Sequence, residues 1–208
     1  MRFIAFEGLD GSGKSTLISS LKAEFESRQI GYVISREPGG TELGNEVRQL
    51  LLRIKGEAPV ARAEALLYQA DRAQHVETVI KPALKSGKWV LSDRFAASSI
   101  AFQAGGREIS EASIQWLNEF STGGLQPDLY VLLDLTVDES LTRLRGRGQE
   151  ADRFEREKAE FHEKVRQGYL KLAQASSQRW LVLSAQDKPH VLFQNLLRAL
   201  KERNWLDW

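Results

Sequence analysis

The 208-residue sequence contains no cysteine, which excludes disulfide bonds and thiol chemistry. Its three histidines, His75, His162 and His190, are far apart in the sequence and lack the spacing typical of metal ligands. No apolar run approaches the length of a membrane span, and the formal net charge is only +1. These absences argue against a disulfide scaffold, a histidine metal centre, a membrane anchor and a strongly basic nucleic-acid surface.

The chain also lacks internal repeats, low-complexity tracts and any long linker, and its first residues show no secretory signal pattern. Apolar residues make up 42% and charged residues 27%, which is typical of a globular domain large enough for a sizeable core. We therefore expect one domain covering residues 1–208, in a cytoplasmic protein.

Short apolar segments alternate with helical patterns along the chain. The expected strands are residues 3–6, 32–35, 88–92, 129–135 and 180–183. The expected helices are residues 17–28, 42–53, 61–86, 96–103, 110–120, 138–145, 153–175 and 190–203, the third interrupted if Pro82 breaks it. This alternation predicts an α/β fold, with a parallel five-stranded sheet covered by helices on both faces.

A glycine-rich stretch, Gly8–Thr16, lies between the first expected strand and the first expected helix. It has the P-loop spacing, in which backbone N–H groups and the helix start cradle phosphates. Lys14 would reach the terminal phosphates of a nucleotide, and the Ser15 hydroxyl would bind Mg²⁺. The alternative is a glycine-rich turn that merely precedes a helix, but the order of strand, turn and helix favours a phosphate site.

Polar residues directly follow four of the expected strands: Gly8–Ser15, Arg36–Glu37, Asp93–Arg94 and Ser184–Ala185. Ligands of parallel sheets bind beyond the carboxyl ends of the strands. We therefore expect these groups to gather along one edge of the sheet.

A P-loop alone does not identify what accepts the phosphoryl group. The Asn-Lys-x-Asp motif of regulatory GTPases is absent, whereas a kinase for a small acceptor needs a second, arginine-lined anionic site. Arg36, Arg72 and Arg94 are candidates for that site. Tyr68 and Arg72 share a helix face and could hold a base and its phosphate. Alternatively, Tyr68 packs in the core and Arg72 pairs with a surface carboxylate, while Arg94 forms an ion pair with its neighbour Asp93.

A segment at about residues 143–153 is rich in arginine and glycine. Arginines on a closing lid would neutralise charge on a transferring phosphoryl group, and the P-loop itself offers none. The alternative is a solvated, basic surface loop.

With these residues in view, the sequence resembles the bacterial thymidylate kinases over essentially its whole length. The matching stretches are Phe6–Thr16, Arg36–Thr41, Asp71–His75, Asp93–Phe95 and Ser98–Gln103. The P-loop is widespread, but the second and fourth stretches together are far more specific. The resemblance implies the nucleoside-monophosphate-kinase form of the P-loop NTPase fold, a homodimer, and Mg²⁺-dependent transfer of the ATP γ-phosphate to dTMP, giving dTDP for dTTP synthesis.

The resemblance also implies a set of site residues. The catalytic candidates are Lys14, Arg94, Arg147, Arg153 and Asp10. The ATP-binding candidates are Gly8, Leu9, Asp10, Gly11, Ser12, Gly13, Lys14, Ser15, Thr16, Arg143, Ser184 and Ala185. The dTMP-binding candidates are Asp10, Arg36, Glu37, Pro38, Tyr68, Arg72, Arg94, Ser98, Ser99, Phe102 and Gln103, and the metal candidates are Ser15 and Asp10.

In this family the residue at Tyr68 stacks on thymine, Arg72 contacts the base, and Arg94 binds the acceptor phosphate. Two positions depart from the common pattern, with Tyr68 in place of Phe and Phe102 in place of a Tyr beside the sugar C2′. Selection of deoxyribose is therefore less clearly implied than selection of the base.

The competing interpretations are another nucleotide or deoxynucleoside kinase, and a P-loop protein that binds nucleotide as a switch or scaffold. Neither nucleic acid nor membrane is an expected partner.

Overall fold

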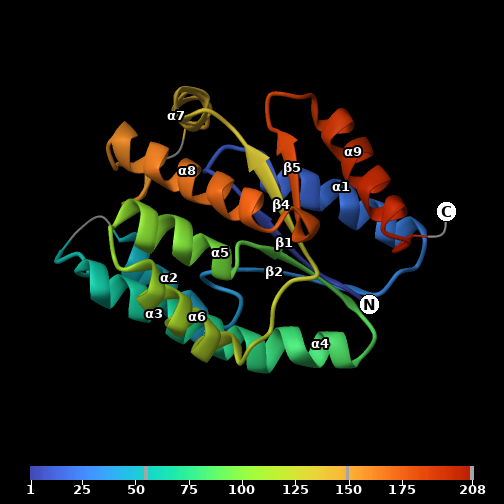
Figure 1. The fold of residues 1–208 in the computed structure, drawn as a ribbon, viewed down its shortest axis with the longest axis horizontal. Coiled ribbons are helices and arrows are strands. Elements are labelled where there is room, and N and C mark those ends of the chain that lie inside the picture. Colours follow the sequence, from blue (N-terminus) through green and yellow to red (C-terminus); the bar gives the residue numbers. More distant parts are fainter. Residues whose placement is uncertain (54–55, 149, 207–208) are drawn as a thin grey trace.

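The computed structural model describes residues 1–53, 56–148 and 150–206. Five strands form one sheet in the order β2-β3-β1-β4-β5, and every neighbouring pair is parallel (Figure 1). The strands are β1 (Phe3–Glu7), β2 (Tyr32–Arg36), β3 (Trp89–Asp93), β4 (Leu129–Asp134) and β5 (Trp180–Ser184). The predicted parallel sheet is confirmed, and each predicted strand agrees within one residue at both ends.

Helices cover both faces of this sheet (Figure 1). On one face lie α1 (Lys14–Ser27) and α9 (Pro189–Glu202). The other described helices are α2 (Glu42–Leu52), α3 (Ala61–His75), α4 (Lys81–Lys85), α5 (Ala96–Ser99), α6 (Glu111–Thr122), α7 (Val137–Gly146) and α8 (Ala159–Ala175). Two π-helical segments, η1 (Val76–Ile80) and η2 (Ile100–Gly106), extend α3 and α5, and a 3-10 turn, η3 (Ser177–Arg179), precedes β5.

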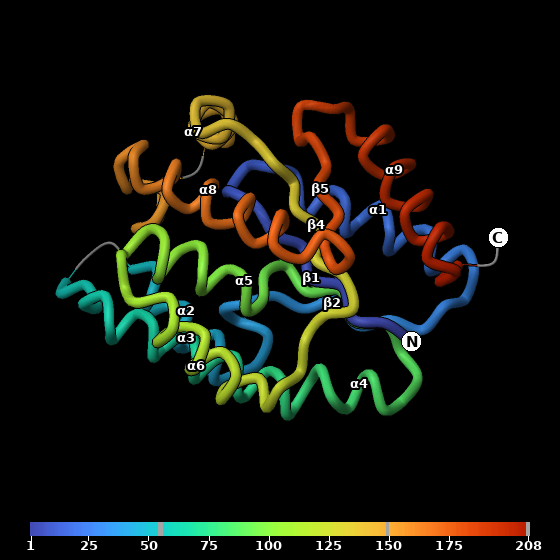
Figure 2. The backbone as a smooth tube through the Cα atoms, in the orientation of Figure 1, coloured from blue at the N-terminus to red at the C-terminus, as the bar shows by residue number. Residues whose placement is uncertain are grey.

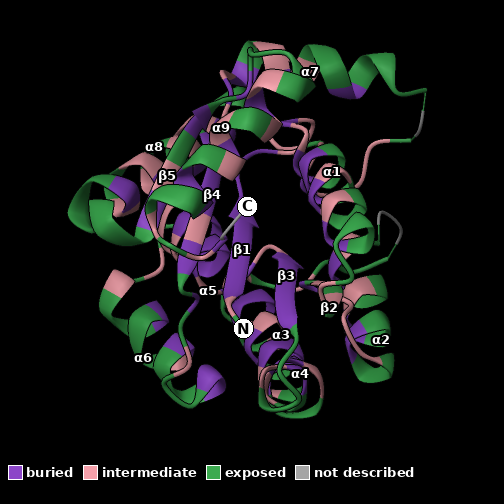
Figure 3. Cartoon of the chain, turned by 90° about the vertical axis from the view of Figure 1, so that its right-hand side faces the viewer, coloured by how far each residue is buried: buried purple, intermediate pink, exposed green. Residues whose placement is uncertain are grey.

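Strand β1 shows why the central strands read as continuous apolar runs. Ile4 and Phe6 pack with α1 and α9, whereas Phe3 and Ala5 pack on the opposite face with η1 and α4. A strand covered on both faces has no solvent side on which polar residues could alternate. Figure 3 shows β1 and β3 as buried strands, while the peripheral helices α6 and α7 carry exposed residues.

The predicted helix over residues 61–86 is continuous but not uniform. Pro82 lies in the first turn of α4, and the π-helical segment η1 comes directly before it. Because proline cannot donate to the preceding turn and its ring crowds that turn, a locally widened helix accommodates it.

The predicted start of a long helix at residue 153 was wrong, since α8 begins at Ala159. Residues 153–156 form a separate turn, in which Asp152 Oδ1 accepts hydrogen bonds from the N–H groups of Phe154 and Glu155, at 2.8 and 3.0 Å. Asp152 thus caps this turn as it would cap a helix, but the extended backbone of Lys158 (φ −67°, ψ 155°) separates the turn from α8. Figure 2 follows the chain from the end of β4 through α7 and on to α8.

None of the helices in the described part of the chain combines the length and apolarity needed to cross a membrane.

Candidate active site

The glycine-rich stretch connects β1 to α1, as predicted. Gly8 has φ +136°, and a Cβ at this position would lie 2.5 Å from the Leu133 carbonyl oxygen, so a larger residue does not fit. Helix α1 follows Gly13, and no side chain among the described residues caps its first N–H groups. These free N–H groups and the positive end of the helix dipole form a site for an anion.

Lys14 begins α1 and is only 7% exposed. Its Nζ donates to the carbonyl oxygens of Gly8 and Leu9, at 3.3 and 3.1 Å. Burial, together with the charge of Arg94, lowers the pKa of Lys14. The amine is therefore folded back over the P-loop, beside the place where a phosphate would meet the helix start.

Asp10 and Arg94 join the P-loop to the end of β3. The Nη2 of Arg94 donates to Asp10 Oδ1 at 2.8 Å, and Lys14 Nζ lies 4.0 Å from the same oxygen. Burial alone would raise the pKa of Asp10, but the positive charges of Arg94 and Lys14 outweigh it and lower the pKa to about 2. The structure thus brings together three of the predicted catalytic residues and leaves Asp10 ionised at neutral pH.

The backbone of Arg94 is in the left-handed region, with φ +74°. This conformation is uncommon for a residue other than glycine and persists only where neighbours hold it. Here the Arg94 N–H donates to the Phe6 carbonyl at 2.9 Å, and Ser92 Oγ donates to the Arg94 carbonyl at 2.7 Å. The strained turn aims the guanidinium back across the P-loop.

A pocket opens beside this ion pair. It is lined by Asp10, Glu37, Pro38, Arg48, Leu52, Tyr68, Arg72, Arg94, Ser98, Phe102, Gln103, Asp152 and Phe154. All the predicted acceptor-site residues line it except Arg36 and Ser99. Residues separated by more than a hundred positions therefore meet at the predicted edge of the sheet, and we call this cavity the acceptor pocket.

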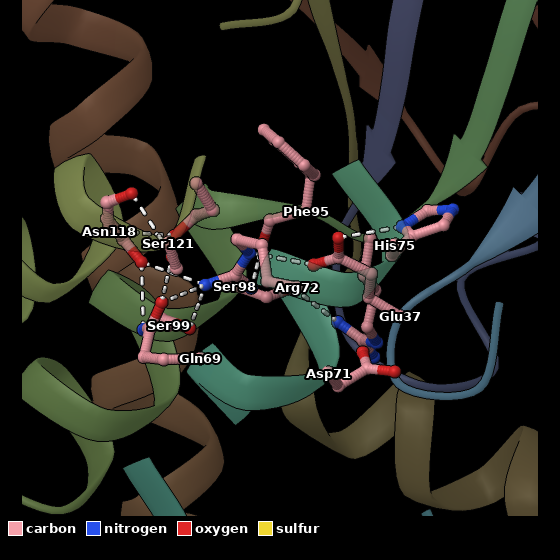
Figure 4. A network of polar contacts seen from close by, with 12 residues as sticks. Glu37, Gln69, Asp71, Arg72, His75, Phe95, Ser98, Ser99, Asn118 and Ser121 are labelled. Atoms are coloured by element: carbon pink, nitrogen blue, oxygen red, sulfur yellow. Dashed lines mark hydrogen bonds and ion pairs between the residues drawn. The ribbon is translucent and has the colours of Figure 1, made fainter. Parts of the chain in front are cut away.

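Arg72 is the buried centre of a polar network (Figure 4). Its side chain is 1% exposed, and its Nε donates to Glu37 Oε2 at 2.8 Å. The other nitrogens donate to Gln69, Ser99, Asn118 and the carbonyl oxygen of Phe95. The alternative of a surface ion pair for Arg72 is therefore wrong, because its carboxylate partner is as buried as the arginine itself.

The loop after β2 is anchored on the same network. Glu37 Oε1 lies 2.9 Å from Nδ1 of His75, and the Gly39 N–H donates to Asp71 Oδ1 at 3.1 Å. The Glu37–Pro38 peptide bond is cis. Burial, together with the negative charge of Glu37, raises the pKa of Asp71 to about 6. Two carboxylates from different elements thus hold one wall of the acceptor pocket.

Aromatic rings form a second wall of the acceptor pocket. The ring centroid of Phe154 lies 5.9 Å from that of Phe102 and 6.2 Å from that of Tyr68. The Arg94 guanidinium lies 5.0 Å from the centroid of Phe102, within cation–π range. A flat ring could stack in this wall while its charged end reaches Arg94.

The remaining predicted acceptor residues bond within the protein. Ser98 Oγ donates to Glu7 Oε2 at 2.6 Å, and Ser99 accepts from Arg72. Gln103 Nε2 donates to Glu64 Oε1 at 3.0 Å, beside the aromatic wall.

The three predicted lid arginines are placed differently. Arg143 donates to the carbonyls of Gly11 and Ala185, at 3.2 and 2.8 Å, so it connects the P-loop with the loop after β5. Arg147 pairs with Glu155 at 2.6 Å and is 41% exposed. Arg153 lies against the acceptor pocket, donating to the Leu51 carbonyl at 2.8 Å and to the buried carboxylate of Glu64 at 2.7 Å. Within the predicted lid segment, Gln149 lies outside the described residues.

A second pocket lies on the other side of the P-loop. It is lined by Ser15, Ile18, Ser19, Ile34, Ser35, Arg36, Gly39, Gly40 and Asp93, so Arg36 is here rather than in the acceptor pocket. The buried Oδ1 of Asp93 has no hydrogen-bond partner among the described residues. A carboxylate oxygen without a proton donor, in a pocket shared with the Ser15 hydroxyl, fits a hard cation.

Sequence reasoning missed Arg48, Leu52, Asp152 and Phe154 in the acceptor pocket. Arg48 donates to the Pro38 carbonyl at 3.0 Å, and burial and Arg36 lower its pKa. A helix at Arg48 was predicted, but the pattern does not say which helix face meets the pocket. Phe154 is 4% exposed, an apolar residue inside an arginine-rich stretch, and that contrast was the available signal.

This arrangement suits transfer between two anions. The P-loop and the start of α1 offer one anion site, and Arg94 with Arg48 offers positive charge in the neighbouring pocket. Among residues 1–53, 56–148 and 150–206 no cluster of three His, Cys, Asp or Glu side chains could hold a metal by itself. A metal here would share its coordination with a ligand, as Mg²⁺ does with phosphates.

Comparison with known proteins places the chain among relatives of one kind. The profile of the Thymidylate kinase family matches residues 6–196. A protein named thymidylate kinase from Bdellovibrio bacteriovorus is 55% identical, over 99% of this chain and 98% of that protein. Another of the same name, from Carboxydothermus hydrogenoformans, is 44% identical over 98% of each. A third, from Clavibacter sepedonicus, is 49% identical over 88% of this chain and 86% of that protein.

The family carries the P-loop fold of the nucleoside monophosphate kinases, which agrees with the parallel sheet and the phosphate-binding turn seen here. With its profile matched over most of the chain and close relatives aligned nearly end to end, this protein belongs to the thymidylate kinase family.

Proposed function

We propose that this protein transfers the γ-phosphate of ATP to dTMP, giving dTDP and ADP for dTTP synthesis. One observation supports this most directly: Arg94 bonds the P-loop at Asp10 and Gly8 and also lines the acceptor pocket. A single guanidinium therefore touches both the donor-phosphate side and the acceptor side. We further propose that residues 1–208 act as one kinase domain, with the lid at about residues 143–153.

On the donor side, the N–H groups of Gly8–Thr16 and the Lys14 amine bind the phosphates of ATP. Lys14 already lies beside the P-loop carbonyls and carries the charge that the transferring group requires. Arg143 connects Gly11 to Ala185, so we place the adenine next to Arg143 and Ser184. Arg147 on the lid supplies further charge.

On the acceptor side, Arg94 and Arg48 bind the dTMP phosphate, and Asp10 keeps Arg94 oriented. The thymine stacks on the Tyr68 ring within the aromatic wall, with Arg72 and Gln103 along its edge. Because five protein groups hold the Arg72 guanidinium, it arrives at the base already oriented. Glu37 and Pro38 close the pocket on the side of the loop after β2.

The catalytic demand on the protein is positioning and charge neutralisation, since phosphoryl transfer needs no covalent help from side chains. Mg²⁺ would supply additional positive charge at the phosphates. The Ser15 hydroxyl and Asp93 share the second pocket and fit it as ligands. Asp10, the other predicted metal candidate, is paired with Arg94 in this structure and holds that arginine in place.

The same proposal includes a homodimer in the cytoplasm. Leu66 on α3 and Trp116 and Phe120 on α6 are 56%, 65% and 76% exposed. The rings of Trp116 and Phe120 are stacked with centroids 5.8 Å apart, so they form one flat apolar patch. Because α3 and α6 pack side by side, all three side chains can meet a second copy.

The test is ADP formation by the purified protein with ATP and Mg²⁺, measured with and without dTMP and then with dUMP, dCMP and the ribose form of the acceptor. We expect formation to depend on dTMP and to fall severely in Lys14→Ala with an unchanged thermal melt. ADP formation that is indifferent to every acceptor would overturn the proposal in favour of a nucleotide switch.

A further inference from the structure

Tyr169 of α8 contacts Arg94 without itself lining the acceptor pocket. Its hydroxyl oxygen accepts a hydrogen bond from Arg94 Nη1 at 3.0 Å. The same nitrogen donates to the Gly8 carbonyl, while Nη2 holds Asp10. The guanidinium is thus fixed by the P-loop at two points and by α8 at a third.

The hydroxyl of Tyr169 has only one proton to give, and the structure assigns its direction. Arg94 can only donate, so the tyrosine oxygen must accept from it. Two oxygens lie 2.8 Å from the tyrosine hydroxyl, Glu7 Oε2 and Ser98 Oγ, and the charged carboxylate is the stronger acceptor for its proton. Ser98 Oγ donates to the same Glu7 Oε2 at 2.6 Å, and the Phe95 N–H donates to Glu7 Oε1 at 2.9 Å. A carboxylate that accepts three hydrogen bonds therefore orients the hydroxyl that holds Arg94.

The cluster of Glu7, Tyr169 and Ser98 is buried, and of its members only Ser98 lines the acceptor pocket. Glu7, Tyr169 and Ser98 are 0%, 1% and 8% exposed, and Tyr169 does not line the acceptor pocket. Burial raises the pKa of Glu7, while the charge of Arg94 and the three hydrogen bonds oppose that rise. Tyr169 reaches the pocket through three lining residues, Arg94, Ser98 and Phe102, and only the first is a charged group that can meet a phosphate.

We propose that Tyr169 is a positioning residue for Arg94, with Glu7 as the group that orients its hydroxyl. The inference rests on the proposed function, because it concerns how Arg94 meets the transferring phosphoryl group. It also gives α8, the helix after the lid segment, a direct contact with that arginine. Loss of the hydroxyl leaves Arg94 charged and bonded to Asp10 and Gly8, but it removes the hydrogen bond by which α8 holds the guanidinium.

The test is Tyr169→Phe, which removes one oxygen and keeps the ring. We expect kcat to fall about 10-fold, equivalent to about 1.4 kcal/mol, while the KM for dTMP stays within about twofold. Binding survives because the charge remains, whereas transfer requires a fixed orientation. Tyr32→Phe is the matched control, since it removes a hydroxyl bonded to Glu26 on the surface and should leave both constants unchanged.

A double-mutant cycle separates positioning from a general loss of structure. In an Arg94→Lys background there is no guanidinium fork to orient, so Tyr169→Phe should change kcat by less than about twofold. Equal losses in both backgrounds, or a raised KM at unchanged kcat, would overturn the inference. If Tyr169→Phe does not fold, Glu7→Gln is assayed in the same two backgrounds with the same expectations.

Failure of the inference is distinguishable from failure of the proposed function. In the first case the unmodified protein forms ADP in response to dTMP, but the two backgrounds lose activity equally. In the second case the unmodified protein itself shows no dependence on dTMP.

Discussion

Phe102 shows how one side chain can serve both packing and selection. Its ring contacts the Arg94 guanidinium and the ring of Phe154, and it is 8% exposed. A phenyl ring can exclude a 2′-hydroxyl by bulk but cannot bond to the sugar. If it lies beside the sugar, deoxyribose selection in this protein is steric.

We expect Phe102→Ala to relax discrimination against the ribonucleotide more than it harms dTMP use, and to lower stability by about 3 kcal/mol through the cavity it leaves. Phe102→Tyr should preserve or sharpen the preference for deoxyribose. The measurement is the ratio of kcat/KM for the two sugars in each variant, at a temperature where both are folded. An unchanged ratio in Phe102→Ala would mean that the ring only packs.

Asp71 makes stability depend on pH. Its pKa rises from an ordinary 3.8 to about 6 in the folded protein, so the folded state holds this proton more tightly than the unfolded state. The resulting stabilisation is complete below about pH 4 and is lost as the pH rises through 6. At neutral pH the buried carboxylate of Asp71 is ionised, and this lowers the free energy of unfolding.

Asp71→Asn should therefore stabilise the protein at pH 8 and have little effect at pH 4. The amide oxygen can still accept from the Gly39 N–H. The gain is at most about 3 kcal/mol, from a pKa difference of roughly two units. Thermal melts at the two pH values test this, with Asp138→Asn on the exposed face of α7 as a control for lost charge. A variant less stable than the parent at pH 8 would contradict the sign.

At the scale of elements, the lid segment divides its arginines between two tasks. Arg147 is exposed and paired only with Glu155 among the contacts described, whereas Arg153 is tied to Glu64 and lies 4.4 Å from the centroid of Phe154. The first is available to a transferring phosphoryl group, and the second supports the wall of the acceptor pocket.

We expect Arg147→Ala to lower kcat about 10-fold or more with a nearly unchanged KM for dTMP, because its charge acts on the transition state. Arg153→Ala should lower kcat and also raise this KM. Steady-state kinetics with varied dTMP measure both, and Arg156→Ala, an exposed pair with Glu150, is the control. If Arg147→Ala merely raises KM, the lid assignment is wrong.

The elements themselves were largely predictable. The strands come from unbroken apolar runs, and the P-loop from its spacing. The start of α8 was not, because residues 153–156 form a turn of their own and Lys158 is extended before the helix begins. Arg48 and Tyr169 lie on helices that were predicted, but the face each helix turns toward the site is decided by packing against distant segments. Tyr169, for example, is bonded to Glu7, which is 162 positions earlier.

The same limit applies to Arg72. The sequence left a base contact and a surface ion pair open, and the partner it has is a buried glutamate from the loop after β2. Charge and spacing predict that Arg72 is a site residue, whereas its burial depends on how distant segments pack in the folded protein. The polar groups that follow the strands could be grouped from the sequence, because parallel strands end at the same edge of the sheet.

On the scale of the whole molecule, the apolar patch of Trp116 and Phe120 should hold two copies together. We expect Trp116→Ser with Phe120→Ser to shift the protein to a monomer in sedimentation experiments, while Val182→Ser, an exposed apolar residue on β5, does not. A monomeric parent protein, or a dimer unaffected by the double substitution, would rule out this surface as the interface.

The buried position of Glu64 bears on how fast nucleotides enter and leave the site. This fully buried carboxylate holds Arg153 and Arg107, and the acceptor pocket beside it has about 60 Å³ of free space. That is far below the roughly 300 Å³ of typical ligand pockets. We therefore expect the segment bearing Arg153 and Phe154 to move outward when a nucleotide enters or leaves. Release of dTDP should accordingly be slower than its formation, and rapid mixing should reveal a burst of ADP in the first turnover; a linear onset would mean that chemistry is the slow step.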